Sequence, residues 1–146
     1  MRKGFTLIEI LIVIGLIVIL GGIAIMTLKP GELLARGRNG ARISHLHTIA
    51  NAIWQNKSDN RGIFNCGSIP TSTTKMAVGA GNYDIAPCLV PAYLPNMPYD
   101  PNTAGAHFSS TTDYDTGYNI ILNASTSRIT ISAPNAELNE IISVTR

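Results

Sequence analysis

The sequence Met1-Arg2-Lys3-Gly4-Phe5-Thr6-Leu7-Ile8-Glu9, followed by an almost unbroken apolar run to Leu28, decides how this chain is built. The 24 residues from position 5 to position 28 contain only three polar side chains, Thr6, Glu9 and Thr27. As a helix rising about 1.5 Å per residue, the run would be roughly 36 Å long, which is enough to cross a bilayer. The sequence therefore predicts a membrane-spanning helix over residues 5–28.

Two cations, Arg2 and Lys3, precede this run without an acid to balance them. Because cytoplasmic flanks of membrane helices are rich in Lys and Arg, we expect the N-terminus in the cytoplasm and the C-terminal part outside. An ordinary secretory signal does not fit, because its apolar core has about 7 to 15 residues and is followed by a cleavage site of small residues. The helix is thus expected to stay with the protein.

Glu9 is the anomaly of the run. An acidic residue at the centre of a membrane helix costs about 2.5 to 3.5 kcal/mol, so an intramembrane carboxylate is a functional candidate that needs a cation nearby. The alternative is that Glu9 lies close enough to the start of the run to reach the headgroup region. From the charge alone, both interpretations stay open.

The stretch Lys3-Gly4-Phe5-Thr6-Leu7-Ile8-Glu9 closely resembles the class III leader of type IV pilins and of type II secretion pseudopilins. The resemblance implies that residues 1–4 are a leader peptide, which a membrane aspartic protease, the prepilin peptidase, removes by cleavage between Gly4 and Phe5. The same enzyme would methylate the new N-terminus at Phe5. The amine on Phe5 of one subunit would then neutralise Glu9 of its neighbour and set the register of assembly.

The resemblance also implies a function. The chain would be a structural subunit of a helical type IV pilus, extracted from the inner membrane by an assembly platform and its ATPase, with copies of itself as the main partner and lipid as the partner before assembly. An alternative is the major pseudopilin of a type II secretion system, whose filament is periplasmic. A second alternative, from another class, is a single-pass membrane protein with a ligand-binding domain outside.

Past the apolar run, Lys29-Pro30-Gly31 predicts an interruption or kink, because proline removes a backbone donor. Residues 29–60 then predict the amphipathic outer half of the helix, with Trp54 anchoring its packing near the end and an apolar stripe of Ile43, Leu46, Ile49, Ala50 and Ile53. A basic stretch in this segment either contacts anionic headgroups or acidic neighbours, or is a solvated helix face; it comprises Lys29, Arg36, Arg38 and Arg42.

The remaining residues, 61–146, predict one small globular head. Residues 63–101 are rich in Gly, Pro, Ser, Thr and Asn and predict a loop region with one short turn of helix. Residues 118–122 and 128–132 predict an antiparallel hairpin around a turn at 123–127, with a third strand from 114–116 or 141–144. The expected fold is α+β and type IV pilin-like, with a long N-terminal helix packed on an antiparallel sheet of about three strands.

Cys66 and Cys88 lie beyond the membrane, where an oxidising compartment favours a disulfide. Such a bridge would close a loop of about 22 residues and contribute on the order of 3 kcal/mol. The alternative is a pair of buried free thiols.

Little in the sequence points to catalysis or to a cofactor. Asp113 and Asp115 offer oxygen ligands that would suit calcium, although two solvated loop aspartates explain them as well. There is no phosphate-binding glycine loop and no nucleophile motif, so we expect no enzyme. Of 11 basic residues, nine remain without Arg2 and Lys3, against nine acidic ones, so no specific nucleic-acid partner is predicted.

Overall fold

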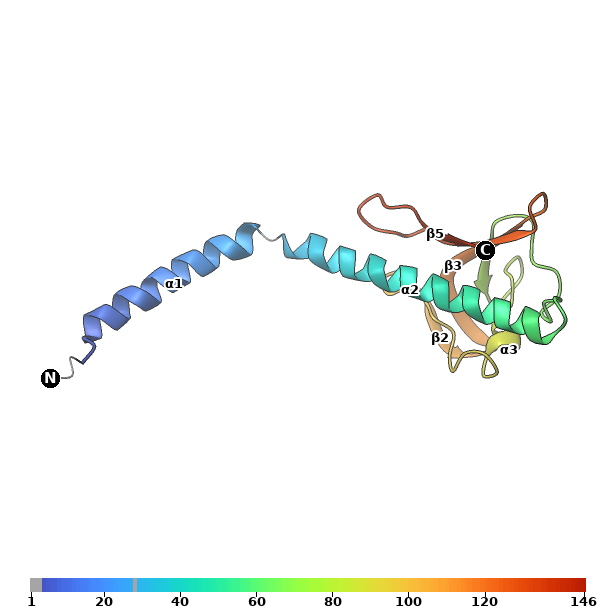
Figure 1. The fold of residues 1–146 in the computed structure, drawn as a ribbon, viewed down its shortest axis with the longest axis horizontal. Coiled ribbons are helices and arrows are strands. Elements are labelled where there is room, and N and C mark those ends of the chain that lie inside the picture. Colours follow the sequence, from blue (N-terminus) through green and yellow to red (C-terminus); the bar gives the residue numbers. More distant parts are fainter. Residues whose placement is uncertain (1–3, 28) are drawn as a thin grey trace. The chain divides into compact units, whose positions relative to one another are not determined.

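The computed structural model describes residues 4–27 and 29–146 (Figure 1). Residues 1–3 of the predicted leader and Leu28, the predicted end of the membrane span, lie outside this range. Two compact units are present, Met1–Ala35 and Arg36–Arg146, and each is described by itself. The elements are α1 (Leu7–Thr27), α2 (Pro30–Asp59), β1 (Thr74–Ala77), α3 (Ala86–Leu89), β2 (His107–Ser110), β3 (Asp113–Asn123), β4 (Arg128–Ala133) and β5 (Ile142–Thr145).

The predicted membrane-spanning segment is a helix. Thr6 caps its start, because the Glu9 amide donates to the Thr6 hydroxyl at 3.3 Å and to the Thr6 carbonyl at 3.1 Å. Residues Leu7–Met26 form a 20-residue segment with a mean hydropathy of 2.9, and none of the apolar window within it is buried. The segment has the length and composition needed to cross a membrane.

The predicted interruption of the helix is confirmed. α1 ends at Thr27, and α2 begins at Pro30. Lys29 has a φ of 42°, in the left-handed region that does not continue a right-handed helix. Proline suits the first position of the new helix because its missing N–H would have had no intrahelical partner there.

α2 buries most of the predicted apolar stripe, namely Leu46, Ile49, Ala50 and Ile53. The predictions for Ile43 and Trp54 were wrong, since these side chains are 44% and 40% exposed. Each directly follows a buried residue, Arg42 or Ile53, and is therefore turned by about 100° from the helix face that packs on the core. Trp54 instead lies under the ammonium group of Lys57, 4.8 Å from the ring centroid.

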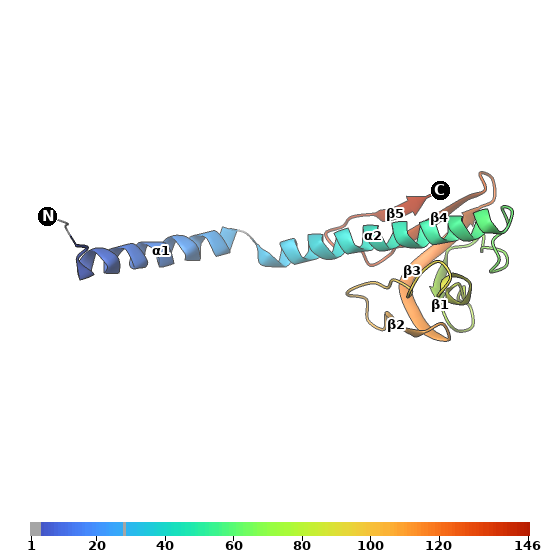
Figure 2. The same ribbon diagram turned by 60° about the horizontal axis from the view of Figure 1, so that its bottom comes forward.

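The sheet has five strands, so the expectation of about three was too low (Figure 2). Its antiparallel order is β1-β3-β4-β5, with β2 also pairing with β3. Of the two candidates for a third strand, residues 142–145 form β5, whereas residues 114–116 are the first part of β3, the 11-residue strand that also contains residues 118–122. The additional strands β1 and β2 have four residues each, and β1 lies within the predicted loop region. Such short segments carry too little alternation to be recognised in a sequence.

The core lies between α2, the sheet and the segment around α3, and its fully buried side chains include Leu46, Met76, Leu89, Tyr118 and Ile131. The predicted short helical turn is α3, and the predicted disulfide Cys66–Cys88 is present with a Cα–Cα distance of 5.6 Å. The fully buried Asn56 joins this loop to the end of α2, donating to the Cys88 carbonyl at 3.3 Å and accepting from the Asn65 amide at 3.1 Å.

Candidate functional site

The peptide bond between Gly4 and Phe5 precedes the first turn of α1, and residues 4–6 lie outside regular secondary structure. Phe5 is 80% exposed. A Cβ atom added at Gly4 would meet no atom within 4 Å, and Gly4 has no positive φ that would require glycine. The described structure therefore gives no packing reason for glycine at this position.

Glu9 lies in the first turn of α1, where the partial positive charge of the helix N-terminus favours a carboxylate. Its side chain is exposed. Among residues 4–27 and 29–146, no cation lies within ion-pair distance of Glu9. The described chain thus holds an acid, inside an apolar helix, that none of these residues neutralises.

The flanks of this acid are apolar on every side. From Leu7 to Met26 the helix has no polar face, and each described side chain on it is exposed. A helix that is hydrophobic all round belongs in a membrane or among other helices. Together, Phe5, Glu9 and the exposed apolar side chains of α1 form a surface suited to lipid or to other helices.

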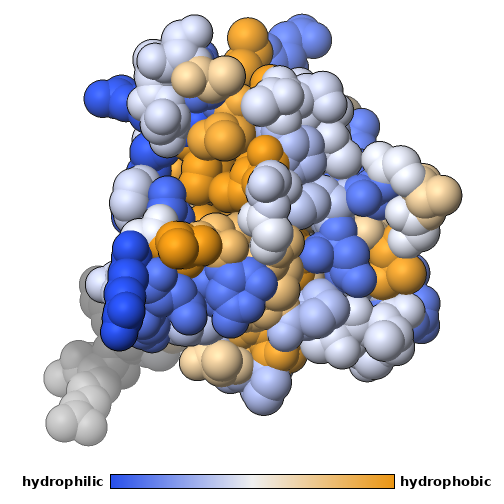
Figure 3. Space-filling view, turned by 90° about the vertical axis from the view of Figure 1, so that its right-hand side faces the viewer, coloured by the Kyte–Doolittle hydropathy of each residue, from blue (hydrophilic) through white to orange (hydrophobic). Residues whose placement is uncertain are grey.

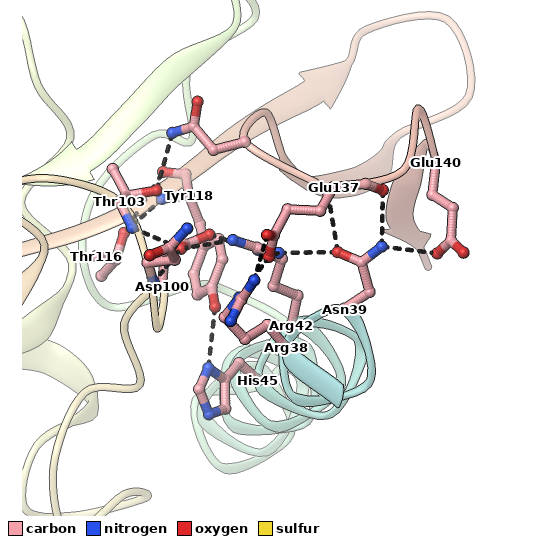
Figure 4. A network of polar contacts seen from close by, with 12 residues as sticks. Arg38, Asn39, Arg42, His45, Asp100, Thr103, Thr116, Tyr118, Glu137 and Glu140 are labelled. Carbon is pink, nitrogen blue, oxygen red and sulfur yellow. Dashed lines mark hydrogen bonds and ion pairs between the residues drawn. The ribbon is translucent and has the colours of Figure 1, made fainter. Parts of the chain in front are cut away.

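A second candidate site is a buried polar network in the head (Figure 4). Arg42 of α2 is 1% exposed, and its guanidinium binds Asp100 through two hydrogen bonds, Nε to Oδ2 at 2.7 Å and Nη2 to Oδ1 at 3.0 Å. Asp100 also accepts from the backbone amides of Asn102 and Thr103, both at 2.9 Å. A bidentate pair with further hydrogen bonds is the arrangement that compensates the desolvation of a buried charge.

The same network reaches the loop between β4 and β5. Glu137 of this loop receives Arg42 Nη1 at 2.9 Å and two hydrogen bonds from Arg38, at 2.6 and 2.7 Å. Asn39 exchanges hydrogen bonds with the Glu137 backbone, donating to its carbonyl at 2.8 Å and accepting from its amide at 3.0 Å, and it donates to Glu140 at 3.0 Å. One turn of α2 therefore fixes both the segment around Asp100 and the β4–β5 loop.

The hydrogen bonds of the network lower the pKa values of its two carboxyl groups, Glu137 and Asp100. Hydrogen bonds from Arg38 and Arg42 lower the pKa of Glu137 from 4.5 to about 2. Burial disfavours the charged form of Asp100, but hydrogen bonds from Arg42 and from neighbouring amides outweigh it and lower the pKa of the carboxyl group. The network is ionised at neutral pH and holds the head together rather than storing a reactive proton.

The sequence did not predict this network. The basic stretch was expected to contact anionic headgroups or acidic neighbours, or to be a solvated helix face. Arg38 and Arg42 instead pair with acids about 60 to 100 positions away in the same chain. The available signal was the spacing of Arg38, Asn39 and Arg42, which places three polar residues on one helix face. Nothing in the sequence identified their partners.

The calcium candidates Asp113 and Asp115 were expected in a loop, but both belong to the strand β3. Asp113 lies 3.1 Å from Nε2 of His107, and Asp115 pairs with Lys75. A third acid in this part of the chain, Asp100, is also paired, with Arg42. The described ranges contain no group of three or more His, Cys, Asp or Glu side chains suited to a metal ion, and calcium binding stays a prediction.

The N-terminal segment matches a known protein-family model. Residues 1–25 match the model of the prokaryotic N-terminal methylation motif, the class III prepilin signal of type IV pilins and pseudopilins. The match covers the Gly4–Phe5 bond, Glu9 and most of α1, and it supports a precursor of the type IV pilin or pseudopilin type, a structural subunit rather than an enzyme. The comparisons with curated proteins and with solved structures found no match.

Proposed function

We propose that this protein is the structural subunit of a type IV pilus, made as a prepilin and anchored in the cytoplasmic membrane by α1 with its head outside. The prepilin peptidase cleaves between Gly4 and Phe5 and methylates Phe5. The observation that carries the proposal is the methylation motif at residues 1–25, joined directly to an apolar helix with an exposed acid in its first turn.

Assembly would supply a cation for Glu9 and apolar neighbours for α1. Cleavage frees an amine on Phe5, and this cation pairs with Glu9 of the neighbouring subunit as helices of several copies pack together. Packing between α1 helices replaces lipid, and small residues permit close approach, namely Gly15, Gly21, Gly22 and Ala24. The inner-membrane platform and its ATPase supply the work of extraction.

A pseudopilin of a type II secretion system is the second candidate. It is favoured by the small head and by the proline-punctuated segment of residues 94–101, which resembles the segment that leads into the sheet in major pseudopilins. In this chain the segment buries Leu94, Met97 and Asp100. The two functions share every step up to assembly. A retraction ATPase encoded beside this gene would indicate a pilus, whereas a secretin with secreted substrate proteins would indicate secretion.

Mass spectrometry of the protein purified from its host tests the processing step. The expected product begins at Phe5 and is heavier by one methyl group. Gly4→Val should block cleavage although the described fold leaves room for the larger side chain, while Gly31→Ala, also without neighbours within 4 Å of the added Cβ, should be processed normally. An intact Met1 in functional protein would overturn the proposal.

The role of Glu9 is tested separately by filament assembly. Glu9→Gln removes the charge and keeps the shape, and we expect processed protein to remain in the membrane without forming filaments. Glu32→Gln is the matched control, because that acid already pairs with Lys29 at 3.1 Å in the same chain. Normal filament yield from Glu9→Gln would contradict the proposed pairing with Phe5.

A further inference from the structure

The loop between β4 and β5, residues 134–141, presents apolar side chains to solvent. Ile141 is 96% exposed, and Leu138 of the same loop is also exposed. Leu138 and Asn139 have φ values of 59° and 57°, in the left-handed region that non-glycine residues avoid. These two residues are the centre of a turn that is closed by a hydrogen bond from the Glu140 amide to the Glu137 carbonyl at 3.2 Å, and this turn places Glu140 and Ile141 at the surface.

The buried network restrains the conformation of this loop. Asn39 donates to the backbone carbonyl of Glu137 and accepts from its amide, while Arg38 and Arg42 bind its carboxylate. The loop is therefore presented in one conformation before any partner arrives. A preorganised loop loses little conformational freedom on binding, which favours its use as a contact surface.

The charge of the loop is not balanced within the head. Glu140 accepts a hydrogen bond from Asn39, but no cation among the described residues lies within ion-pair distance of it. The described part of the chain likewise places no acid within ion-pair distance of three exposed arginines, Arg61, Arg128 and Arg146. Arg61, Arg128 and Arg146 offer charges that are complementary to Glu140.

The arginines lie at the end of the head opposite the loop. Asn39 holds the loop, and α2 runs for about 30 Å beyond it to Asp59, just before Arg61. Arg128 begins β4, whose other end leads into the loop, and Arg146 is beside it because the backbones of Ile129 and Arg146 exchange two hydrogen bonds. Figures 1 and 2 both place the end of α2 and the β3–β4 turn at this end. We call it the distal end, defined by Trp54, Arg61, Ile63, Arg128 and Arg146.

The distal end also carries exposed apolar side chains, Trp54 and Ile63. Figure 3 looks onto it and shows hydrophobic residues gathered in a band with hydrophilic residues around it. Lys57, stacked on Trp54, adds a further positive charge. The surface thus combines apolar area with basic charge, whereas the β4–β5 loop combines apolar side chains with an unpaired acid.

We propose that the β4–β5 loop of one copy packs against the distal end of a second copy in the filament, with Ile141 against Ile63 and Glu140 paired with Arg61 or Arg128. Two different patches joined in this way make a head-to-tail contact, which generates an open helical assembly when the rotation does not close a ring. This contact rests on the proposed function. It adds a bond between heads to the pairing of Phe5 with Glu9.

Cysteine cross-linking in filaments of the full chain tests the apolar part. Cys66 and Cys88 are already bonded to each other, so they leave introduced cysteines free to pair. Ile141→Cys combined with Ile63→Cys should give a ladder of cross-linked multimers on oxidation. The control combines Ile141→Cys with Val78→Cys, an exposed apolar position after β1 at the opposite edge of the sheet, and should remain monomeric.

The outcomes separate the contact from the proposed function. Wild-type filaments that yield no ladder with the first pair, or no more than with the control pair, would overturn the contact alone. Failure of correctly processed wild-type protein to form any filament would overturn the proposed function and the contact with it.

Charge reversal tests the ionic part. Glu140→Arg should lower filament yield about tenfold, because it brings like charges together at the interface, and a net loss of about 1.4 kcal/mol corresponds to that factor. Adding Arg61→Glu or Arg128→Glu should restore it, and Glu140→Gln, which keeps an acceptor for Asn39, should have a smaller effect. The melting temperature of each variant in detergent confirms that the head is folded. Full assembly by Glu140→Arg, or rescue by neither arginine variant, would overturn the pairing.

Discussion

The two helices of this protein satisfy their side chains in opposite ways. Apart from Glu9, α1 carries an apolar surface that is exposed along the predicted membrane span, whereas α2 buries a stripe of apolar residues together with a charged arginine. In the described residues, every buried side-chain nitrogen and oxygen has a hydrogen-bond partner. The buried polar groups of the head are therefore satisfied within the chain, whereas the exposed apolar side chains of α1 are suited to lipid or to other helices.

The difference shows where stability comes from in each region. A buried charge is tolerated only when partners surround it, and Arg42 has Asp100, Glu137 and Asn39 within the same chain. An apolar helix needs no such specific partners, since hydrocarbon from any source satisfies it. Substitutions in α2 should accordingly lower the stability of the head, whereas substitutions in α1 should lower membrane insertion.

The largest effect is expected for Arg42→Leu, which leaves Asp100 charged, buried and without its main partner. Loss of one member of a buried ion pair costs about 3 to 5 kcal/mol. Urea denaturation of the full chain in detergent, followed by tryptophan fluorescence, should show this loss. Arg36→Leu is the control, because this arginine is exposed in the same helix and should change stability by about 0.5 kcal/mol or less. Equal midpoints for the two variants would contradict the comparison.

Ile17→Arg at the middle of α1 should reduce membrane insertion without changing the stability of the head. A cation at the centre of a membrane helix costs about 2.5 to 3.5 kcal/mol for insertion. We expect less protein in carbonate-washed membranes, with an unchanged denaturation midpoint of the head. Ile17→Leu should behave as wild type, and a shifted midpoint for Ile17→Arg would show that the two regions are not independent.

Gly117→Ala should destabilise the head by an intermediate amount. Gly117 has a φ of 70°, and an added Cβ would lie 3.0 Å from Cβ of Asp100, at the centre of the network. The left-handed conformation alone costs an alanine about 1 to 2 kcal/mol. Gly40→Ala in α2 has open space around it and should instead stabilise by up to about 1 kcal/mol. Thermal melts of both variants would therefore move in opposite directions.

The smallest effect is a dependence on acid pH. The folded-state pKa of Glu137, about 2, lies below its ordinary value of 4.5, so the stability from its pairing is present above pH 4.5 and is lost as pH falls toward 2. The lowered pKa of Asp100 acts in the same direction. Wild type should lose melting temperature faster than Glu137→Gln across this range, and parallel curves would exclude the contribution of Glu137.

Much of the outline could be predicted from local pattern. The helix over α1, its interruption before Pro30, the β3–β4 hairpin and the Cys66–Cys88 bridge are all present. Apolar run length, proline and alternation are properties of neighbouring residues, and they act before the chain folds. The strands β1 and β2 escaped prediction because each has four residues and forms by pairing with β3.

The sequence by itself determined that this chain carries a prepilin-type signal and an apolar helix, because short spacing and composition encode both. Only the tertiary structure decided the role of the basic stretch. Arg38 and Arg42 could have faced headgroups or solvent, and folding instead brings Asp100 and Glu137 to them from distant positions. Such pairing is set by how the elements pack, and a pattern along one segment contains no record of the partner.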